Sequence, residues 1–169
     1  MSISAKFGFI FAGLAAVLLG VGGASLMAGR AQQAESAAAS EQLGAFTEVL
    51  VPLADDLRAL QVDVIQVQQF FTDVAASHEA GGMAEAAKYA EDFRSRLHRL
   101  RQLAGRLPPA AGRLLPDDWA ARLAELETRF DRYDTTGATM AHAYLEKGQE
   151  AGNAEMEKFD PLAADLAGR

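Results

Sequence analysis

Cysteine is absent from this chain of 169 residues, which excludes disulfides, thiolate metal ligands and a cysteine nucleophile. Positive charge is also in deficit, because 16 Lys and Arg residues stand against 23 Asp and Glu residues and give a net charge of -7. A surface that binds duplex nucleic acid needs clustered positive charge to displace counterions from phosphates. Nucleic acid is therefore not an expected partner.

The chain also lacks the common motifs of catalytic and cofactor sites. No HExxH, GxSxG, GxxxxGK[ST] or EF-hand pattern occurs. The three histidines are His78, His98 and His142, and none stands in a Glu-x-x-His motif of the kind that holds metals in helical bundles. We therefore predict no enzymatic activity, no catalytic residue, no metal site and no cofactor.

One long uncharged segment is present, at residues 7–29, between Lys6 and Arg30. As a helix it would exceed the hydrocarbon core of a bilayer, which is about 30 Å thick. It is also longer than the apolar core of a signal peptide, and its exit is a weak cleavage site. We expect residues 1–30 to form a cytoplasmic start and an uncleaved transmembrane anchor in the inner (plasma) membrane. Residues 31–169 are then expected outside the cytoplasm.

Small residues recur at four-residue spacing within this predicted span. They are Ala12, Ala16, Gly20 and Ala24. Such a stripe lets two helix backbones approach closely and predicts a dimer face in the membrane. The alternative is that Ala and Gly are simply common in spanning helices.

The rest of the chain shows no β-alternation, and its apolar residues recur at spacings of three and four. The longest run of this kind is Leu50, Leu53, Leu57, Leu60, Val64, Val67, Phe71, Val74 and His78. The pattern is typical of a coiled-coil seam and predicts a first helix from the membrane to about Ser77. We expect a kink or a weakened turn at Pro52, and a break at Gly81-Gly82.

Three further seams follow along the chain. They comprise Ala86, Ala90, Phe93, Leu97 and Leu100; Trp119, Leu123, Leu126, Phe130, Tyr133, Gly137, Met140 and Tyr144; and Met156, Phe159, Ala163 and Leu166. Pro116-Asp117-Asp118 predicts the start of the third helix. Gly148 and Gly152-Asn153 are expected to separate it from a short fourth helix at about residues 153–168. The predicted fold class is all-α: a transmembrane helix followed by an up-down antiparallel helical bundle of three long helices and a short fourth.

The short fourth helix bears on oligomeric state. It cannot cover the whole length of the first helix, so we expect the membrane-proximal seam from Leu43 to Leu53 to be partly exposed. Pairing with a second copy would bury this seam. Together with the stripe of small residues in the span, it predicts a homodimer.

Charge is distributed unevenly between the first two helices. Eight acids and one Arg58 lie between Glu35 and Glu79, whereas seven bases and two acids lie between Lys88 and Arg113. The Arg side chains of the second helix are expected to pair with the acidic first and fourth helices. The alternative is that some of them bind an anionic ligand, because guanidinium groups match carboxylates bidentately. Arg94 and Arg101 are the candidates for that role.

Polar side chains also flank the first seam between Asp63 and Val74. Gln66, Gln69 and Asp73 lie beside it, and Tyr133 of the third helix offers a hydroxyl group. These groups either hydrogen-bond across the bundle or form a small polar recess for a ligand. The candidate ligand-binding residues are therefore Gln66, Gln69, Asp73, Arg94, Arg101 and Tyr133.

The run from Val64 to Val74 resembles the first helix of the four-helix-bundle sensor regions of bacterial methyl-accepting chemotaxis proteins. That branch carries a V-I-Q-V-Q-Q-[aromatic]-x-T-D-[IV] pattern. Further similarity lies at Phe130, Tyr133, Gly137, Met140, Ala141, Tyr144, Gly148, Gly152, Asn153, Met156, Phe159 and Asp160, so the resemblance covers essentially the whole chain. A start such as Ser2 to Lys6 before an apolar span is also typical of these receptors.

This resemblance implies a periplasmic sensor domain for chemotaxis signal transduction. Its expected partners are an unknown small-molecule ligand or a periplasmic binding protein. A complete receptor would continue into a second span, a HAMP linker and a cytoplasmic signalling coiled coil, whereas this chain ends at Arg169. We therefore expect a truncated receptor or a stand-alone sensor module. The alternatives are a membrane-anchored metal- or haem-binding helical bundle and a purely structural bundle that binds a partner.

Overall fold

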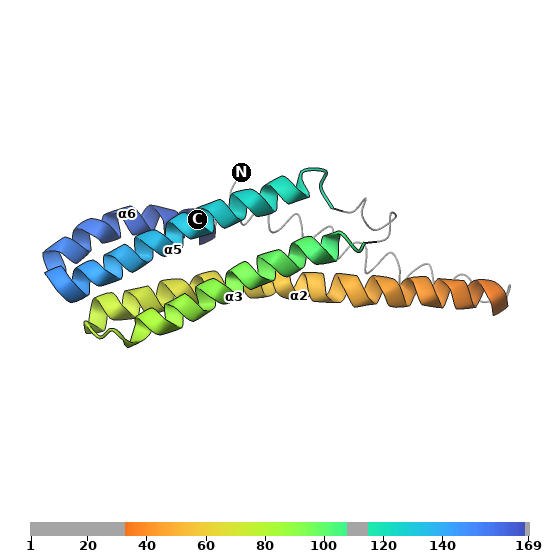
Figure 1. Cartoon of the computed structure of the whole chain (residues 1–169), viewed down its shortest axis with the longest axis horizontal. Coiled ribbons are helices and arrows are strands. Elements are labelled where there is room, and N and C mark those ends of the chain that lie inside the picture. Colours follow the sequence, from red (N-terminus) through yellow and green to blue (C-terminus); the bar gives the residue numbers. More distant parts are fainter. Residues whose placement is uncertain (1–32, 108–114, 168–169) are drawn as a thin grey trace.

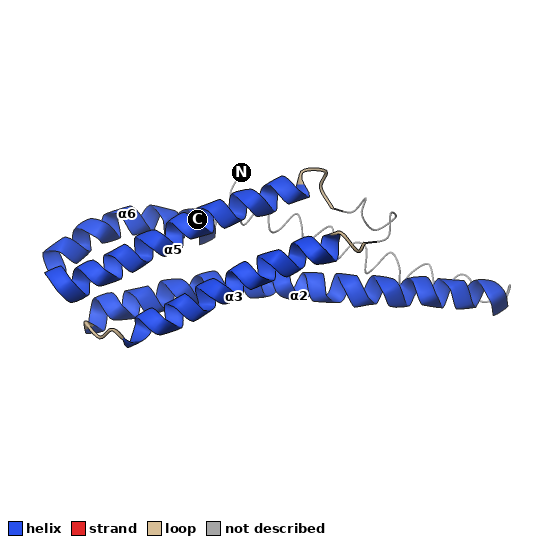
Figure 2. Ribbon diagram, in the orientation of Figure 1, coloured by secondary structure: helices blue, strands red, loops and turns tan. Residues whose placement is uncertain are grey.

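The computed structural model describes residues 33–107 and 115–167. Four helices account for most of them: α2 (Gln33–Ser77), α3 (Gly81–Ala104), α5 (Trp119–Lys147) and α6 (Gln149–Ala167). Figure 2 shows only helices and loops in these residues, so the prediction of an all-α fold is confirmed for the part that the structure describes.

The four helices form two antiparallel hairpins. α2 packs mainly against α3, and α5 packs mainly against α6. Both hairpin turns lie at the same end of the molecule, which we call the turn end, and α2 extends beyond the other helices at the opposite end (Figure 1). The arrangement confirms the predicted up-down order of three long helices and a shorter fourth.

The predicted transmembrane anchor lies outside the described residues. This holds for the whole of residues 1–30, including the predicted dimer face at Ala12, Ala16, Gly20 and Ala24. Among the helices that the structure describes, none is long and apolar enough to cross a membrane. The anchor and its dimer face therefore stay predictions.

α2 is one continuous helix of 45 residues that ends at Ser77, as predicted. It also continues through Pro52, whose side chain is exposed. The expectation that the seam up to Leu53 lacks cover was wrong for its described leucines, because Leu50 is only 4% exposed and Leu53 is 0% exposed. Both belong to one buried cluster that takes in all four helices. The side chain of Leu43 lies outside the described residues.

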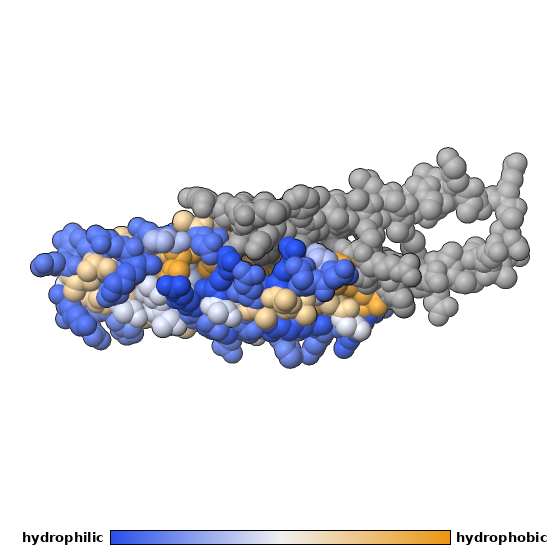
Figure 3. All heavy atoms as spheres, turned by 90° about the horizontal axis from the view of Figure 1, so that it is seen from above, coloured by the Kyte–Doolittle hydropathy of each residue, from blue (hydrophilic) through white to orange (hydrophobic). Residues whose placement is uncertain are grey.

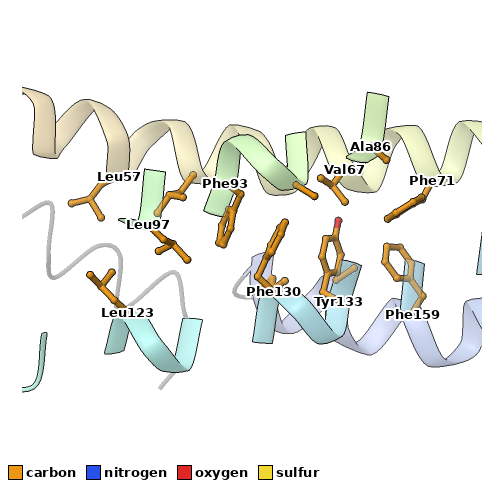
Figure 4. Close-up of a cluster of buried hydrophobic side chains, with 14 of the residues drawn as sticks. Leu57, Val67, Phe71, Ala86, Phe93, Leu97, Leu123, Phe130, Tyr133 and Phe159 are labelled. Carbon is orange, nitrogen blue, oxygen red and sulfur yellow. The ribbon is translucent and has the colours of Figure 1, made fainter. Parts of the chain in front are cut away.

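Five aromatic side chains from all four helices meet in the core, and we call them the aromatic column. They are Phe71 of α2, Phe93 of α3, Phe130 and Tyr133 of α5, and Phe159 of α6 (Figure 4). The rings of Phe93 and Phe130 stack with centroids 3.7 Å apart, and those of Tyr133 and Phe159 stack at 5.0 Å. Phe71 meets Phe159 edge to face at 6.3 Å. The column joins the two hairpins across the middle of the bundle.

Two glycines allow the helices to approach closely. A Cβ atom at Gly137 of α5 would overlap the rings of Phe71 and Phe159, and one at Gly152 would overlap the ring of Tyr144. The sequence suggested that Gly152 helps to separate the last two helices. This was wrong, because α6 already begins at Gln149 and Gly152 lies within it. The break is Gly148 alone, where a φ of 85° reverses the chain.

The space at Gly137 predicts opposite effects for two Gly-to-Ala changes. Gly137→Ala is expected to lower the free energy of unfolding by about 1–3 kcal/mol, because its methyl group displaces rings of the aromatic column. Gly44→Ala is the matched control, since nothing lies within 4 Å of its added Cβ. There the better helix propensity of alanine should raise stability by up to about 1 kcal/mol. Thermal melting of the purified full-length chain, followed by circular dichroism, measures both. Equal shifts in the two variants would contradict this packing.

Candidate functional site

Two buried carboxylates of α2 face two guanidinium groups of α3, and we call these four residues the ionic ladder. Asp56 accepts two hydrogen bonds from Arg99, from Nε at 2.9 Å and from Nη2 at 2.6 Å. Asp63 accepts one from Nε of Arg96 at 2.9 Å. Nη1 of Arg96 also lies 3.6 Å from Asp56, so that one guanidinium group bridges both carboxylates. Asp56 is 6% exposed and Asp63 is 2% exposed.

The spacing of these residues explains why they meet. Asp56 and Asp63 are seven residues apart and lie on one face of α2, while Arg96 and Arg99 are three apart on α3. Burial of a carboxylate is costly unless it is paired, and the ladder supplies one guanidinium group for each. Four opposite charges therefore hold α2 and α3 in one axial register.

Asp63 accepts one hydrogen bond from a guanidinium group, whereas Asp56 accepts two. Burial raises the pKa of Asp63, and the charge and hydrogen bond of Arg96 only partly offset this effect. The negative charges of Asp92 and Asp56 raise the pKa further. The pKa of Asp63 therefore lies above the ordinary value, which means that folding disfavours its ionised form relative to the unfolded chain.

The candidate ligand residue Arg94 is already paired with carboxylates of α5. Its Nη2 donates to Asp131 at 2.7 Å and to Asp134 at 2.9 Å, and its guanidinium group lies over the ring of Phe130. Burial lowers the pKa of Arg94, but the hydrogen bonds and charges of these two carboxylates outweigh it and leave the pKa raised.

Arg101, the other candidate cation, donates to Glu127 of α5 at 2.6 Å. The expected pairing of the basic helix with the first helix is therefore confirmed by the ionic ladder. Its other partners lie on the third helix, α5, and not on the fourth. α6 pairs instead with Arg129 of α5, which donates to Asp165 at 3.0 Å. An anionic ligand at Arg94 or Arg101 would have to displace these carboxylates.

Tyr133 is buried in the aromatic column and its hydroxyl donates to the backbone carbonyl of Val64 at 3.0 Å. A helical carbonyl oxygen can accept this second bond because it carries two lone pairs. Burial, with a smaller contribution from the charge of Asp134, raises the pKa of Tyr133. The phenol therefore stays neutral and ties α5 to α2.

The structure does not bring the polar candidates of α2 into one recess with Tyr133. Gln66 is half-buried, whereas Gln69 and Asp73 are exposed. Asp73 follows Val64 by nine residues, or about two and a half helical turns, so it lies on the opposite side of α2 from the carbonyl that binds Tyr133. These three residues form an outer polar patch on α2, and their side chains make no hydrogen bond with another described residue.

Sequence reasoning missed the ionic ladder as a site. Asp56 and Asp63 flank the first seam at a seven-residue interval, and the closely spaced arginines of α3 lie opposite them. Two aspartates at this interval on one helix and closely spaced arginines on the next are the pattern from which the ladder could have been predicted. Among the described residues no group of three or more His, Asp or Glu side chains is placed to hold a metal ion.

The raised pKa of Asp63 predicts that removing its charge increases the stability of the fold at neutral pH. A group with a raised pKa in the folded state stabilises the fold when protonated, and this contribution is lost as the pH rises through the folded pKa. Asp63→Asn, which cannot ionise, should therefore unfold at a higher denaturant concentration than the wild type at pH 7. Asp56→Asn is the control and should be destabilising, because it weakens a bidentate pair.

The advantage of Asp63→Asn should shrink as the pH falls through the pKa of Asp63 and vanish below about 4, where the wild-type carboxyl is protonated in both states. Urea unfolding of the full-length chain between pH 3 and pH 8 tests this. A loss of stability in Asp63→Asn at pH 7 would show that Arg96 stabilises the carboxylate more than burial penalises it.

Comparisons with known proteins do not identify a family. No family model matches the chain, and neither the curated proteins nor the solved structures contain a match. The resemblance to chemotaxis sensor regions thus rests on the residues of the sequence, and the function is inferred from these and from the geometry.

Proposed function

We propose that the chain is a single-pass, membrane-anchored sensor module of the chemoreceptor type. Its helical bundle lies on the periplasmic or extracellular side and binds a small solute or a periplasmic binding protein. Binding shifts α2 relative to the membrane as the first step of chemotaxis signal transduction. Catalysis is not part of this proposal.

The continuity of α2 is the observation that carries the proposal. Its 45 residues form a rod of roughly 68 Å, from Gln33 to the turn end of the bundle. Gln33 follows the predicted span by only a few residues. A displacement of α2 at the bundle would therefore be carried along one continuous helix to within a few residues of the predicted span.

The ionic ladder supports this role because it makes α2 and α3 move together. Asp56 and Asp63 are fixed to Arg99 and Arg96 by charge-assisted hydrogen bonds. The second hairpin, α5 and α6, contacts α2 and α3 through the aromatic column, the Tyr133 hydroxyl and the ion pairs of α3 with α5. A ligand that changes the fit between the two hairpins would thus act on α2.

The outer polar patch indicates the class of solute. Gln66, Gln69 and Asp73 offer two amides and one carboxylate, whereas Arg94 and Arg101 are occupied by carboxylates of α5. Carboxylate and amide oxygens accept hydrogen bonds from ammonium groups. We therefore propose a polar or cationic solute at the patch.

The predicted orientation can be tested with single cysteines because the natural chain has none. Ser95→Cys is exposed on α3 and should react with a membrane-impermeant maleimide in intact spheroplasts. Ser2→Cys precedes the predicted span and should react only after lysis. Labelling of both residues only after lysis would place the bundle in the cytoplasm and end the sensor proposal in this form.

Ligand binding predicts a shift in melting temperature, since a solute that binds only the folded state stabilises it. Cationic and neutral amino acids, tested one by one against the full-length chain, form a suitable panel. A stabilising solute should lose its effect in Asp73→Asn and in Gln69→Ala. It should keep its effect in Thr139→Ala, which is exposed on α5. If no solute of this panel shifts the melting temperature, the purely structural alternative is favoured.

A further inference from the structure

Charged side chains lie mostly at the surface of the bundle. Figure 3 shows a largely hydrophilic face, as expected where charged groups are solvated. Asp56 and Asp63 are the exceptions, since no other charged residue in the described part of the chain is buried. Water cannot replace a lost partner of a buried carboxylate. The gain or loss of one charge in the ionic ladder would therefore act strongly on the packing of α2 against α3.

A third carboxylate, that of Asp92 on α3, lies close to the ladder. It is near enough for its charge to act on Asp63. Asp92 is half-buried, and its side chain makes no hydrogen bond or ion pair with another described residue. It precedes Arg96 by four residues, which places the two side chains next to each other on α3 in the order that favours an ion pair within a helix. Arg96 thus has an unused partner on its own helix.

The acids outnumber the bases in this cluster. Asp56, Asp63 and Asp92 are three negative charges, and Arg96 and Arg99 are two positive charges. Arg96 is the shared base, because its Nε lies 2.9 Å from Asp63 and its Nη1 lies 3.6 Å from Asp56. A proton that enters the cluster therefore reduces an excess of negative charge, and it leaves Arg96 with one partner fewer.

The second hairpin offers Asp63 no competing charge. Tyr133 of α5 approaches α2 at the carbonyl of Val64, and burial keeps its phenol neutral. Asp134, the next residue of α5, is held by Arg94. In the described part of the chain, no charged group of α5 or α6 contributes to the pKa of Asp63. A proton on Asp63 would thus change the pairing within the ladder and leave the contacts of α5 as they are.

We propose that Asp63 is a proton-binding site and that its protonation transfers Arg96 from Asp63 on α2 to Asp92 on α3. The carboxylate takes a proton from solvent and becomes neutral, so the hydrogen bond from Nε of Arg96 loses its charge assistance. Arg96 then pairs with the ionised carboxylate of Asp92. One of the links between α2 and α3 is replaced by a link within α3, while Arg99 stays bound to Asp56.

Mild acid is the stimulus for this exchange. The pKa of Asp63 lies above the ordinary value, so Asp63 gains its proton before exposed carboxylates do as the pH falls. The bundle stays folded, because protonation removes the cost of burying this charge. What changes is how strictly the ladder holds α2 in register with α3. The inference depends on the ladder alone and not on the membrane anchor or on a solute.

Nuclear magnetic resonance of the Arg96 side chain tests the exchange in the full-length chain, with Arg96→Lys to identify its Nε–H signal. Between about pH 8 and pH 5 this signal should move with the same midpoint as the carboxyl carbon of Asp63. Asp63→Asn, which imitates the protonated carboxyl, should place the signal at its acid position already at pH 7. An Arg96 signal that stays unchanged while Asp63 titrates would overturn the proposal.

The role of Asp92 needs a separate variant. In Asp63→Asn with Asp92→Asn, the Nε–H of Arg96 lacks both carboxylates and should exchange with water about tenfold faster than in Asp63→Asn alone. Glu91→Gln is the matched control, since Glu91 is the exposed acid next to Asp92, and it should leave this exchange unchanged. Equal exchange rates with and without Asp92 would overturn the transfer of Arg96. Membrane orientation and solute binding enter neither measurement, so a failure here is distinct from a failure of the sensor proposal.

Discussion

The close contact of α5 with α2 and α6 at Gly137 is the constraint on which the rest of the bundle depends. Only a residue without a side chain leaves room there for the rings of Phe71 and Phe159. The ring of Phe159 also stacks on Tyr133, which contacts Phe130, and Phe130 stacks on Phe93. Each of the four helices therefore contributes a ring to one packed column. Because dispersion contacts are lost steeply with distance, a small displacement at Gly137 would loosen contacts along the whole column.

The ionic ladder fixes the axial register of α2 against α3 more strictly than apolar packing does. Within the first hairpin, apolar seams alone specify the axial register weakly, since a similar apolar residue lies about one helical turn away on each helix. Asp56 and Asp63 do not tolerate a shift between the helices, because a slip of α3 would remove their guanidinium partners and leave two buried carboxylates unpaired. The ladder thus specifies register within the first hairpin, while the aromatic column specifies how the two hairpins meet.

Much of this fold could be predicted from the sequence, because a seam at three- and four-residue spacing identifies the buried face of a helix. Seven of the nine positions from Leu50 to His78 are buried, with Val64 half-buried and His78 exposed at the end of α2. The start of α6 could not be predicted, since Gly152 reads as a break until its contact with Tyr144 is known. The partners of the arginines also depend on how each helix is rotated about its axis. Spacing within one helix does not determine this rotation, so Arg94 and Arg101 pair with α5 and not with the fourth helix.

α2 contradicts the simple rule that polar residues face water and apolar residues face the core. Two of its aspartates are buried, and two valines and one isoleucine are exposed. A helix with a single neighbour would gain stability from the reverse arrangement. The buried residues of α2 serve two interfaces around its circumference: the ladder toward α3 and the aromatic column toward α5 and α6. Neither interface takes in Val51, Val62 or Ile65, so the buried aspartates and the exposed apolar residues of α2 follow from which sides of the helix its described neighbours cover.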